Sequence, residues 1–72
     1  MEFSLRLKDL RGDAEKTQKE IAAVLKISQQ QYELYENGKR EIPLRHFITL
    51  AKYYNVSLDY LAGVSDTPRK FG

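Results

Sequence analysis

Along most of the chain, apolar residues return every three or four positions, the spacing that places them on one face of an α-helix. The first such stripe lies between residues 3 and 11 and consists of Phe3, Leu7 and Leu10. A later stripe, between residues 43 and 54, consists of Leu44, Phe47, Ile48, Ala51 and Tyr54. The chain has no internal repeat and no β-hairpin signal, so the pattern predicts an all-α fold.

Two helix-start signals divide the middle of the chain. Thr17 can accept a hydrogen bond from the amide three residues later, and Glu20 can reach back to the threonine amide, which makes a capping box. Ser28 is expected to cap the next helix, with Gln31 as its reciprocal partner. The inward side of the first helix is expected to carry Ile21, Ala22 and Leu25. Because only residues 26–28 connect the two helices, the segment is typical of a helix-turn-helix.

Further stop and start signals mark the remaining helix boundaries. The helix that begins at Gln29 should end at Asn37–Gly38, because this pair is a strong C-terminal signal. Later boundaries are marked by Pro43 in a first turn, Asn55 at a helix end, and Ser57 and Gly63 around a short fifth helix. We therefore expect one five-helix domain over residues 1–64, followed by a polar tail over residues 65–72.

Composition excludes several classes of protein. Seventy-two residues form one small domain with a thin stability margin. The absence of cysteine excludes disulfides and thiolate metal sites. The single histidine, His46, is expected on an exposed side of its helix, without an acid–base partner or nucleophile around it. We therefore expect no enzyme, no metal and no cofactor.

Membrane and export signals are also missing from the sequence. The longest apolar run, Ile21–Leu25, has five residues, whereas a bilayer span needs about 20. The opening Met1-Glu2-Phe3 is not a basic segment followed by an apolar stretch, so it does not match a secretion signal. A cytoplasmic protein is expected.

Charge is distributed unevenly, although 12 basic and 10 acidic residues leave a net charge of only +2. Between residues 37 and 54 the only acid is Glu41. The basic residues of the same stretch are Lys39, Arg40, Arg45 and Lys52. Such a local excess of positive charge is what a phosphate-facing surface requires.

The helix from Gln29 to about Glu36 has two chemically different sides. At 100° per residue, Tyr32 and Tyr35 share a flank that can pack inward. Gln29, Gln30 and Glu33 fall on the other side. Glutamine matches the N6/N7 edge of adenine, and glutamate can accept from cytosine N4, so this face suits the major groove. On the pattern alone, an ordinary solvated face explains it equally well.

The segment QKEIAAVLKISQQQYELYENGKR, residues 18–40, resembles the helix-turn-helix of the Xre/Cro family, the phage-repressor type. The resemblance extends upstream through RLKDLR, from Arg6, and downstream through IPLRHFITLAKYYNVSLDYLAG, to Gly63, without a gap. It covers about four-fifths of the chain. It implies a five-helix, lambda-repressor-like domain that binds double-stranded DNA and regulates transcription, most often as a repressor.

The resemblance also implies roles for individual residues. The base-reading positions are Gln29, Gln30, Glu33 and Leu34. The phosphate-binding positions are Gln18, Asn37, Lys39, Arg40 and, more weakly, Arg45. In relatives the position of Leu34 often carries a polar residue. A leucine there either touches a thymine methyl group or packs at the edge of the core. Gln18 opens a helix whose N-terminus attracts phosphate, although a plain helix residue is the alternative. A solvated turn is the alternative for residues 37–40.

A third role implied by the resemblance is structural. Arg11 and Glu36 match a partly buried salt bridge between the first and third helices. Two positions depart from the family pattern. Lys26 stands where the turn usually has glycine, and a left-handed backbone there would cost on the order of 1 kcal/mol. Lys16 replaces the apolar residue that usually precedes the Thr17 cap, which weakens the loop from Gly12.

The partners expected are double-stranded DNA and a second copy of the chain. Surplus apolar surface near the C-terminal end is expected from Tyr53, Tyr60, Val64 and Phe71. Together with the resemblance, this surface indicates a homodimer on a near-palindromic operator. The alternative from another functional class is an antitoxin, a protein-binding module that masks a toxin with the same helical scaffold.

Overall fold

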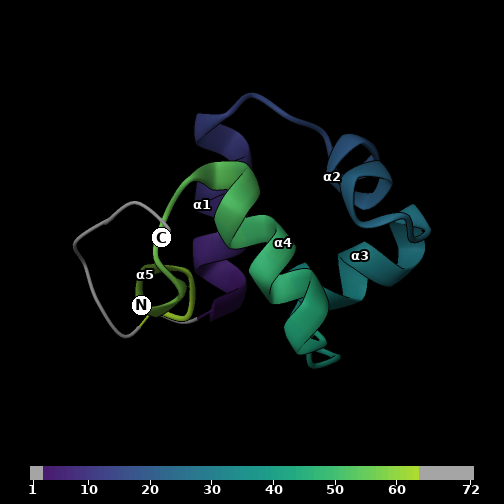
Figure 1. The fold of residues 1–72 in the computed structure, drawn as a ribbon. Helices are drawn as coiled ribbons and strands as arrows, with labels where there is room; N and C mark the ends of the chain where they lie inside the picture. Colours follow the sequence, from purple (N-terminus) through teal and green to yellow (C-terminus); the bar gives the residue numbers. More distant parts are fainter. Residues whose placement is uncertain (1–2, 64–72) are drawn as a thin grey trace.

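The computed structural model describes residues 3–63, and this part of the chain is a bundle of short helices (Figure 1). The helices are α1 (Phe3–Asp13), α2 (Gln18–Leu25), α3 (Gln29–Glu36), α4 (Leu44–Tyr54) and α5 (Leu58–Leu61). The predicted all-α fold with five helices is confirmed. The expectations for Val64, Phe71 and the tail over residues 65–72 lie outside the described residues.

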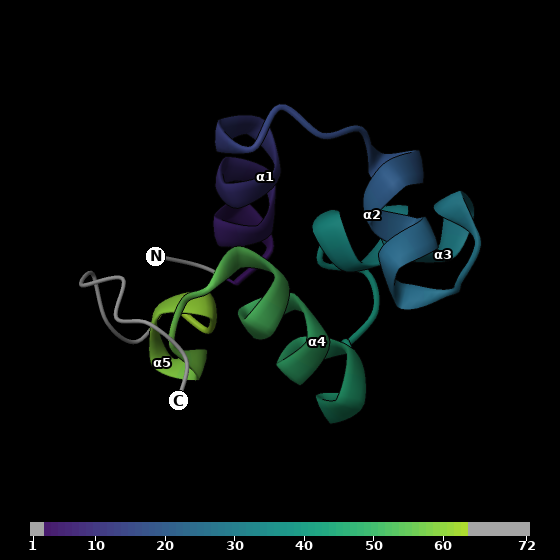
Figure 2. The same cartoon turned by 45° about the horizontal axis from the view of Figure 1, so that its top comes forward.

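The helices divide the molecule into two sides. Helices α2 and α3 lie together at one side and α5 lies at the opposite side, with α1 and α4 between them in both views (Figure 1, Figure 2). The buried apolar core consists of Leu7, Ile21, Ala22, Leu25, Tyr32, Tyr35, Leu50, Ala51, Val56 and Leu61. Each of the five helices contributes to this core, so the helix-turn-helix is part of one packed unit with the rest of the domain.

Helix α1 extends two residues beyond the segment of residues 3–11 that carries the first predicted apolar stripe. The helix passes through Gly12 to Asp13, and the next turn is closed by Ala14 N donating to Leu10 O at 3.0 Å. The chain then turns at Glu15, whose φ of 57° is in the left-handed region. A single glycine is tolerated in a helix at about 1 kcal/mol, so Gly12 loosens the pattern without ending the helix.

Helices α2 and α3 begin at the predicted caps. The Thr17–Glu20 capping box is complete: Glu20 N donates to Thr17 Oγ1 at 3.1 Å, and Thr17 N donates to Glu20 Oε1 at 3.0 Å. Ser28 Oγ accepts from Gln31 N at 3.1 Å. The predicted reciprocal bond from the Gln31 side chain is wrong, because that amide donates to the Tyr35 hydroxyl instead, at 3.1 Å.

Between the two helices, Lys26 adopts the left-handed conformation, with φ 59° and ψ 41°. Its amide donates to Ala23 O at 3.1 Å, and the Ile27 amide donates to Ala22 O at 3.0 Å. These bonds satisfy carbonyls that the end of a helix otherwise leaves open. The turn therefore forms although a lysine stands where the family pattern led us to expect glycine, and the lysine backbone is strained.

The predicted inner stripe of α4 is partly wrong. Leu44 is 68% exposed, whereas Leu50 is completely buried. His46, expected on an exposed side, is buried at 9% exposure, and its ring centroid lies 6.4 Å from that of Tyr35. The face that packs is therefore centred on His46, Phe47, Leu50, Ala51 and Tyr54.

Across residues 3–63, no helix combines the length and the apolar character that crossing a bilayer requires.

Candidate nucleic-acid interface

The two sides of α3 differ in exposure as well as in chemistry. Gln29, Gln30 and Glu33 are exposed, and Leu34 is half-buried. Ser28 caps the helix and leaves the glutamines in its first turn, where side chains of a second helix in this motif reach base edges. Since Glu33 follows one turn later, these polar groups lie on one outward face.

The opposite side of α3 is anchored by two tyrosines. Tyr32 is completely buried and Tyr35 is 1% exposed. Burial and the neighbouring Glu36 carboxylate raise the pKa of Tyr32 far above its ordinary value of 10.0, so its hydroxyl stays protonated. The bond from Gln31 Nε2 to the Tyr35 hydroxyl holds the third glutamine of the run against the helix. Of three consecutive glutamines, two are therefore exposed and one is tied down.

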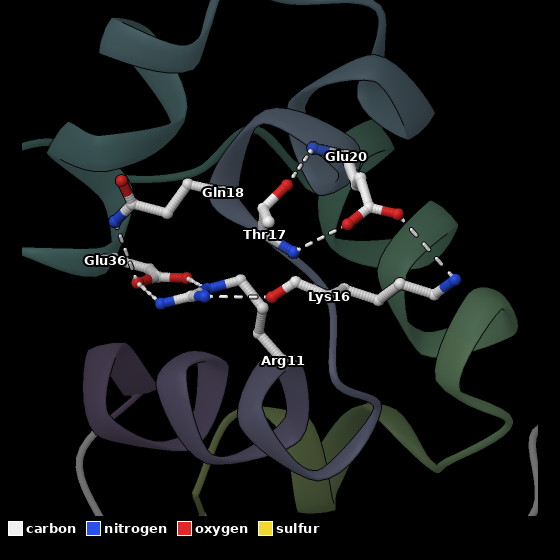
Figure 3. Close-up of polar contacts among 6 residues, drawn as sticks. All are labelled: Arg11, Lys16, Thr17, Gln18, Glu20 and Glu36. Carbon is white, nitrogen blue, oxygen red and sulfur yellow. Dashed lines mark hydrogen bonds and ion pairs between the residues drawn. The ribbon is translucent and has the colours of Figure 1, made fainter.

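A polar network joins α1, α2 and α3 behind this helix (Figure 3). Arg11 Nε donates to Glu36 Oε2 at 2.6 Å, and Arg11 Nη2 donates to Glu36 Oε1 at 3.2 Å. Gln18 Nε2 donates to the same Oε1 at 3.2 Å. Arg11 Nη1 donates to the backbone carbonyl of Lys16 at 3.0 Å. The Glu36 side chain is 0% exposed, whereas 23% of the Arg11 side chain is exposed.

The charge of Glu36 depends on these donors. Burial acts to raise the pKa of this carboxyl, but the hydrogen bonds from Arg11 and Gln18, together with the positive charge of Arg11, outweigh burial and hold the pKa below its ordinary value of 4.5. The hydrogen bonds that Arg11 donates to Glu36 likewise raise the pKa of Arg11. At neutral pH the pair is therefore ionised on both sides, and it fixes the C-terminal end of α3 on α1.

The turn after α3 presents polar and basic groups. Asn37, Lys39 and Arg40 are exposed, and Gly38 has a φ of 71°. The Lys39 amide donates to Leu34 O at 3.0 Å, which closes the end of the helix. A Cβ placed on Gly38 would lie 3.6 Å from Ser4 Oγ, an ordinary contact, so the demand for glycine here is conformational. The turn thus lies beside the first residues of α1.

Not every expected phosphate-binding residue lies free at the surface. Arg45 is exposed in the first turn of α4, on the same chain segment as Lys39 and Arg40. Gln18, in contrast, is half-buried at the first position of α2, with one amide hydrogen bonded to Glu36. The structure therefore connects Gln18 to the pair formed by Arg11 and Glu36, a connection that the sequence did not indicate.

A family model described as helix-turn-helix matches residues 7–61. The chain belongs to this family, in its Xre/Cro-like branch. The matched residues extend from the packed part of α1 to the last residue of α5, so the family unit includes all five helices.

Named members of the helix-turn-helix family resemble this chain over most of its length. It is 37% identical to the HTH-type transcriptional regulator ImmR of Bacillus subtilis (strain 168), over 97% of this chain and 55% of ImmR. It is 32% identical to the cryptic phage CTXphi transcriptional repressor RstR of Vibrio cholerae, over 90% of this chain and 59% of RstR. This chain therefore spans little more than half the length of either relative.

A solved structure gives the same result for the fold. The crystal structure of a transcriptional regulator from Listeria innocua matches with a TM-score of 0.83 and 26% identity, over 86% of this chain and 58% of that chain. The resemblance to the Xre/Cro-type helix-turn-helix fold is thereby confirmed.

The packing of α1 on α5 uses a residue that was not predicted from the sequence. Arg6 is only 5% exposed, and its guanidinium lies 3.9 Å from the ring centroid of Tyr60. This cation–π contact joins α1 to α5 and leaves Tyr60 half-buried, so Tyr60 is not the surplus exposed surface that was expected. Tyr53 is 41% exposed, as expected. Arg6 directly precedes Leu7, which belongs to the predicted apolar stripe of the first helix. This position beside the stripe was the one sequence signal that could have indicated the burial of Arg6.

Proposed function

We propose that this helix-turn-helix domain binds double-stranded DNA sequence-specifically and regulates transcription as a repressor, with α3 in the major groove. The observation that carries the proposal is the outward amide face of α3, Gln29 and Gln30, on a helix whose other side is fixed by buried tyrosines. The names of the relatives support it, since ImmR is a transcriptional regulator and RstR is a repressor.

Sequence would be read by side chains from the first two turns of α3. The amides of Gln29 and Gln30 can each accept from adenine N6 and donate to N7, and Glu33 can accept from cytosine N4. Leu34, half-buried beside them, offers a methyl contact to thymine. The polar contacts specify bases because a wrong base leaves a donor or acceptor unpaired at the interface.

Affinity would come from contacts to phosphate on both sides of α3. Gln18 lies at the start of α2, and Asn37, Lys39, Arg40 and Arg45 follow α3. Such contacts position the helix without reading sequence. About six contacts per complex predict a slope of about −5 for the logarithm of the binding constant against the logarithm of salt concentration.

We further propose that two copies bind a near-palindromic operator, with half-sites roughly 34 Å apart. Tyr53, 41% exposed and packed edge-on against Tyr54 with ring centroids 5.1 Å apart, offers an aromatic surface for such a contact. Sedimentation of the chain with its operator should give two copies per duplex. One copy per duplex at tens of micromolar would contradict the dimer. A protein acting in this way works in the cytoplasm, on the nucleoid.

Selection from random duplexes, read by sequencing, tests the proposal. Repeated binding should enrich one short motif with two-fold symmetry. Lys39→Ala and Arg40→Ala should weaken binding to every duplex by a similar factor and flatten the salt slope, because they remove phosphate contacts. If selection enriches no motif and duplex binding is insensitive to salt, the proposed function is wrong.

A further inference from the structure

We infer that Glu36 is a positioning residue for DNA binding: it holds the side-chain amide of Gln18 in the orientation that contacts a backbone phosphate. The inference rests on the proposed function and goes beyond it, because it gives the pair of Arg11 and Glu36 a second role besides joining α1 to α3. The decisive contact is the hydrogen bond of 3.2 Å from Gln18 Nε2 to Glu36 Oε1.

The chemistry of this hydrogen bond fixes the orientation of the Gln18 amide. A side-chain amide can rotate to present either its oxygen or its nitrogen to a neighbour, but a carboxylate only accepts hydrogen bonds. Glu36 therefore selects the nitrogen of Gln18, and the amide oxygen points away from the carboxylate (Figure 3). The amide nitrogen has two hydrogens and Glu36 takes one of them. The second remains to donate to a phosphate oxygen.

The charge of Glu36 is balanced within the network. A carboxylate beneath a phosphate-binding amide would repel the phosphate if its charge were not balanced. Arg11 balances it, since two guanidinium nitrogens donate to the two oxygens of Glu36, at 2.6 and 3.2 Å. Glu36 can therefore hold Gln18 without adding net negative charge to the site.

The same arginine also fixes the backbone just before Gln18. Arg11 Nη1 donates to Lys16 O at 3.0 Å, directly before the capping residue Thr17. The first turn of α2 and the first side chain of α2 are thus held by one connected set of contacts. A side chain that is ordered before binding loses less conformational entropy when it meets its ligand.

The free protein gives the first test, by NMR relaxation of side-chain amide nitrogens. Gln18 Nε2 should be ordered, whereas Nε2 of the exposed Gln30 serves as the internal control and should be mobile. Equal mobility of the two amides would overturn the inference. This test needs no DNA, so its result stands whatever the outcome for the proposed function.

The second test is a double-mutant cycle on binding to the selected operator. Arg11→Met/Glu36→Met removes the acceptor of Gln18 together with one positive and one negative charge, and replacing both partners of a buried pair is often close to neutral for folding. Gln18→Ala should weaken operator binding about tenfold in the wild-type background, as expected when a hydrogen bond to a charged group is removed. In the Met/Met background the same substitution should weaken binding less than about twofold, because Gln18 is no longer positioned there.

If Arg11 and Glu36 only joined α1 to α3, Gln18→Ala would weaken operator binding equally in the wild-type and Met/Met backgrounds. That result would overturn the inference. Lys8→Met/Asp9→Met, on the exposed side of α1, is the matched control, because it also removes one charge of each sign and leaves the network intact. In this control background Gln18→Ala should keep its full effect. If the Met/Met variant does not fold by circular dichroism, the relaxation test decides. If the wild-type chain prefers no duplex sequence, the proposed function fails, and the phosphate role of Gln18 fails with it.

Discussion

The two sides of α3 carry out different tasks within eight residues. The inner side consists of Tyr32, Tyr35 and Glu36, each at most 1% exposed. Gln29, Gln30 and Glu33, on the outer side, are exposed. The inner side determines where the helix lies, and the outer side determines what it can touch. Changes on the inner side should therefore alter stability, and changes on the outer side should alter recognition alone.

The largest expected effect comes from removing an inner anchor. Tyr32→Ala should lower the free energy of unfolding by about 3–5 kcal/mol, because it removes a completely buried aromatic ring and leaves a cavity. Urea denaturation followed by circular dichroism measures this change. Tyr53→Ala, the same substitution at a tyrosine that is 41% exposed, should cost less than about 1 kcal/mol. Equal costs at the two sites would contradict the packing role of Tyr32.

The next largest effect is expected at the ion pair between Arg11 and Glu36, where a substitution should reverse the pH dependence of the folding stability. In the wild type, the pKa of Glu36 is lowered from its ordinary value of 4.5, and this shift stabilises the fold at pH values above 4.5. The contribution is lost as the pH falls through the folded-state pKa. Arg11→Met removes the main donor, so burial raises the pKa of Glu36. The variant should be about 3 kcal/mol less stable near pH 7 and should gain stability on acidification toward about pH 5.

Denaturation series at several pH values measure both slopes. Because Arg11→Met acts through folding, operator binding should recover under conditions where the variant is folded, apart from the contribution of Gln18. A variant that loses stability on acidification in parallel with the wild type would show that Arg11 does not control the charge of Glu36.

On the outer side the effect should appear in binding and not in stability. Gln29→Ala with Gln30→Ala should weaken operator binding by about 1–3 kcal/mol for each bidentate amide–adenine pair that the substitutions remove. The melting temperature should stay nearly unchanged, because both side chains are exposed. Titration of operator and scrambled duplexes, together with a melting curve, separates these results. If the melting temperature falls with the affinity, the two sides of α3 are not independent.

The smallest expected effect lies in the turn before α3. Lys26→Gly should raise the free energy of unfolding by about 0.5–1 kcal/mol, because glycine relieves the left-handed strain but loses more conformational entropy on folding. Asn55→Gly is the matched control, since Asn55 caps α4 with a φ of 57°, close to the 59° of Lys26. Asparagine tolerates this conformation, so its replacement should change stability by less than about 0.5 kcal/mol. A larger gain at Asn55 than at Lys26 would contradict the strain at lysine.

The helix boundaries could be predicted because they depend on neighbouring residues. The bonds at Thr17, Glu20 and Ser28 span three positions, and the left-handed turn at Asn55 follows from that residue itself. The buried face of α4 could not be predicted as well. Leu44 and His46 are only two positions apart, and which of them packs depends on how α4 lies against its neighbours. Leu44 is an apolar residue at the end of a stripe, and it stays exposed because the helix extends past the core there.

The same distinction holds for the candidate interface. The exposed glutamines on α3 followed from helical periodicity. The hydrogen bond between Gln18 and Glu36 joins residues 18 positions apart and so depends on tertiary structure. Gln31 was assigned to the wrong partner because two local bonds competed for its amide. The spacing of four residues to Tyr35 was a signal for the bond that forms.

The most direct measurement replaces one acceptor atom of the proposed DNA partner. In the selected operator, each adenine of the half-site is replaced in turn by 7-deazaadenine, which lacks the N7 acceptor in the major groove. At one or two positions the replacement should weaken wild-type binding, and it should have no effect on the Gln29→Ala/Gln30→Ala variant. If no position weakens wild-type binding, or if the double variant is weakened equally, the amides of α3 do not read adenine in the major groove.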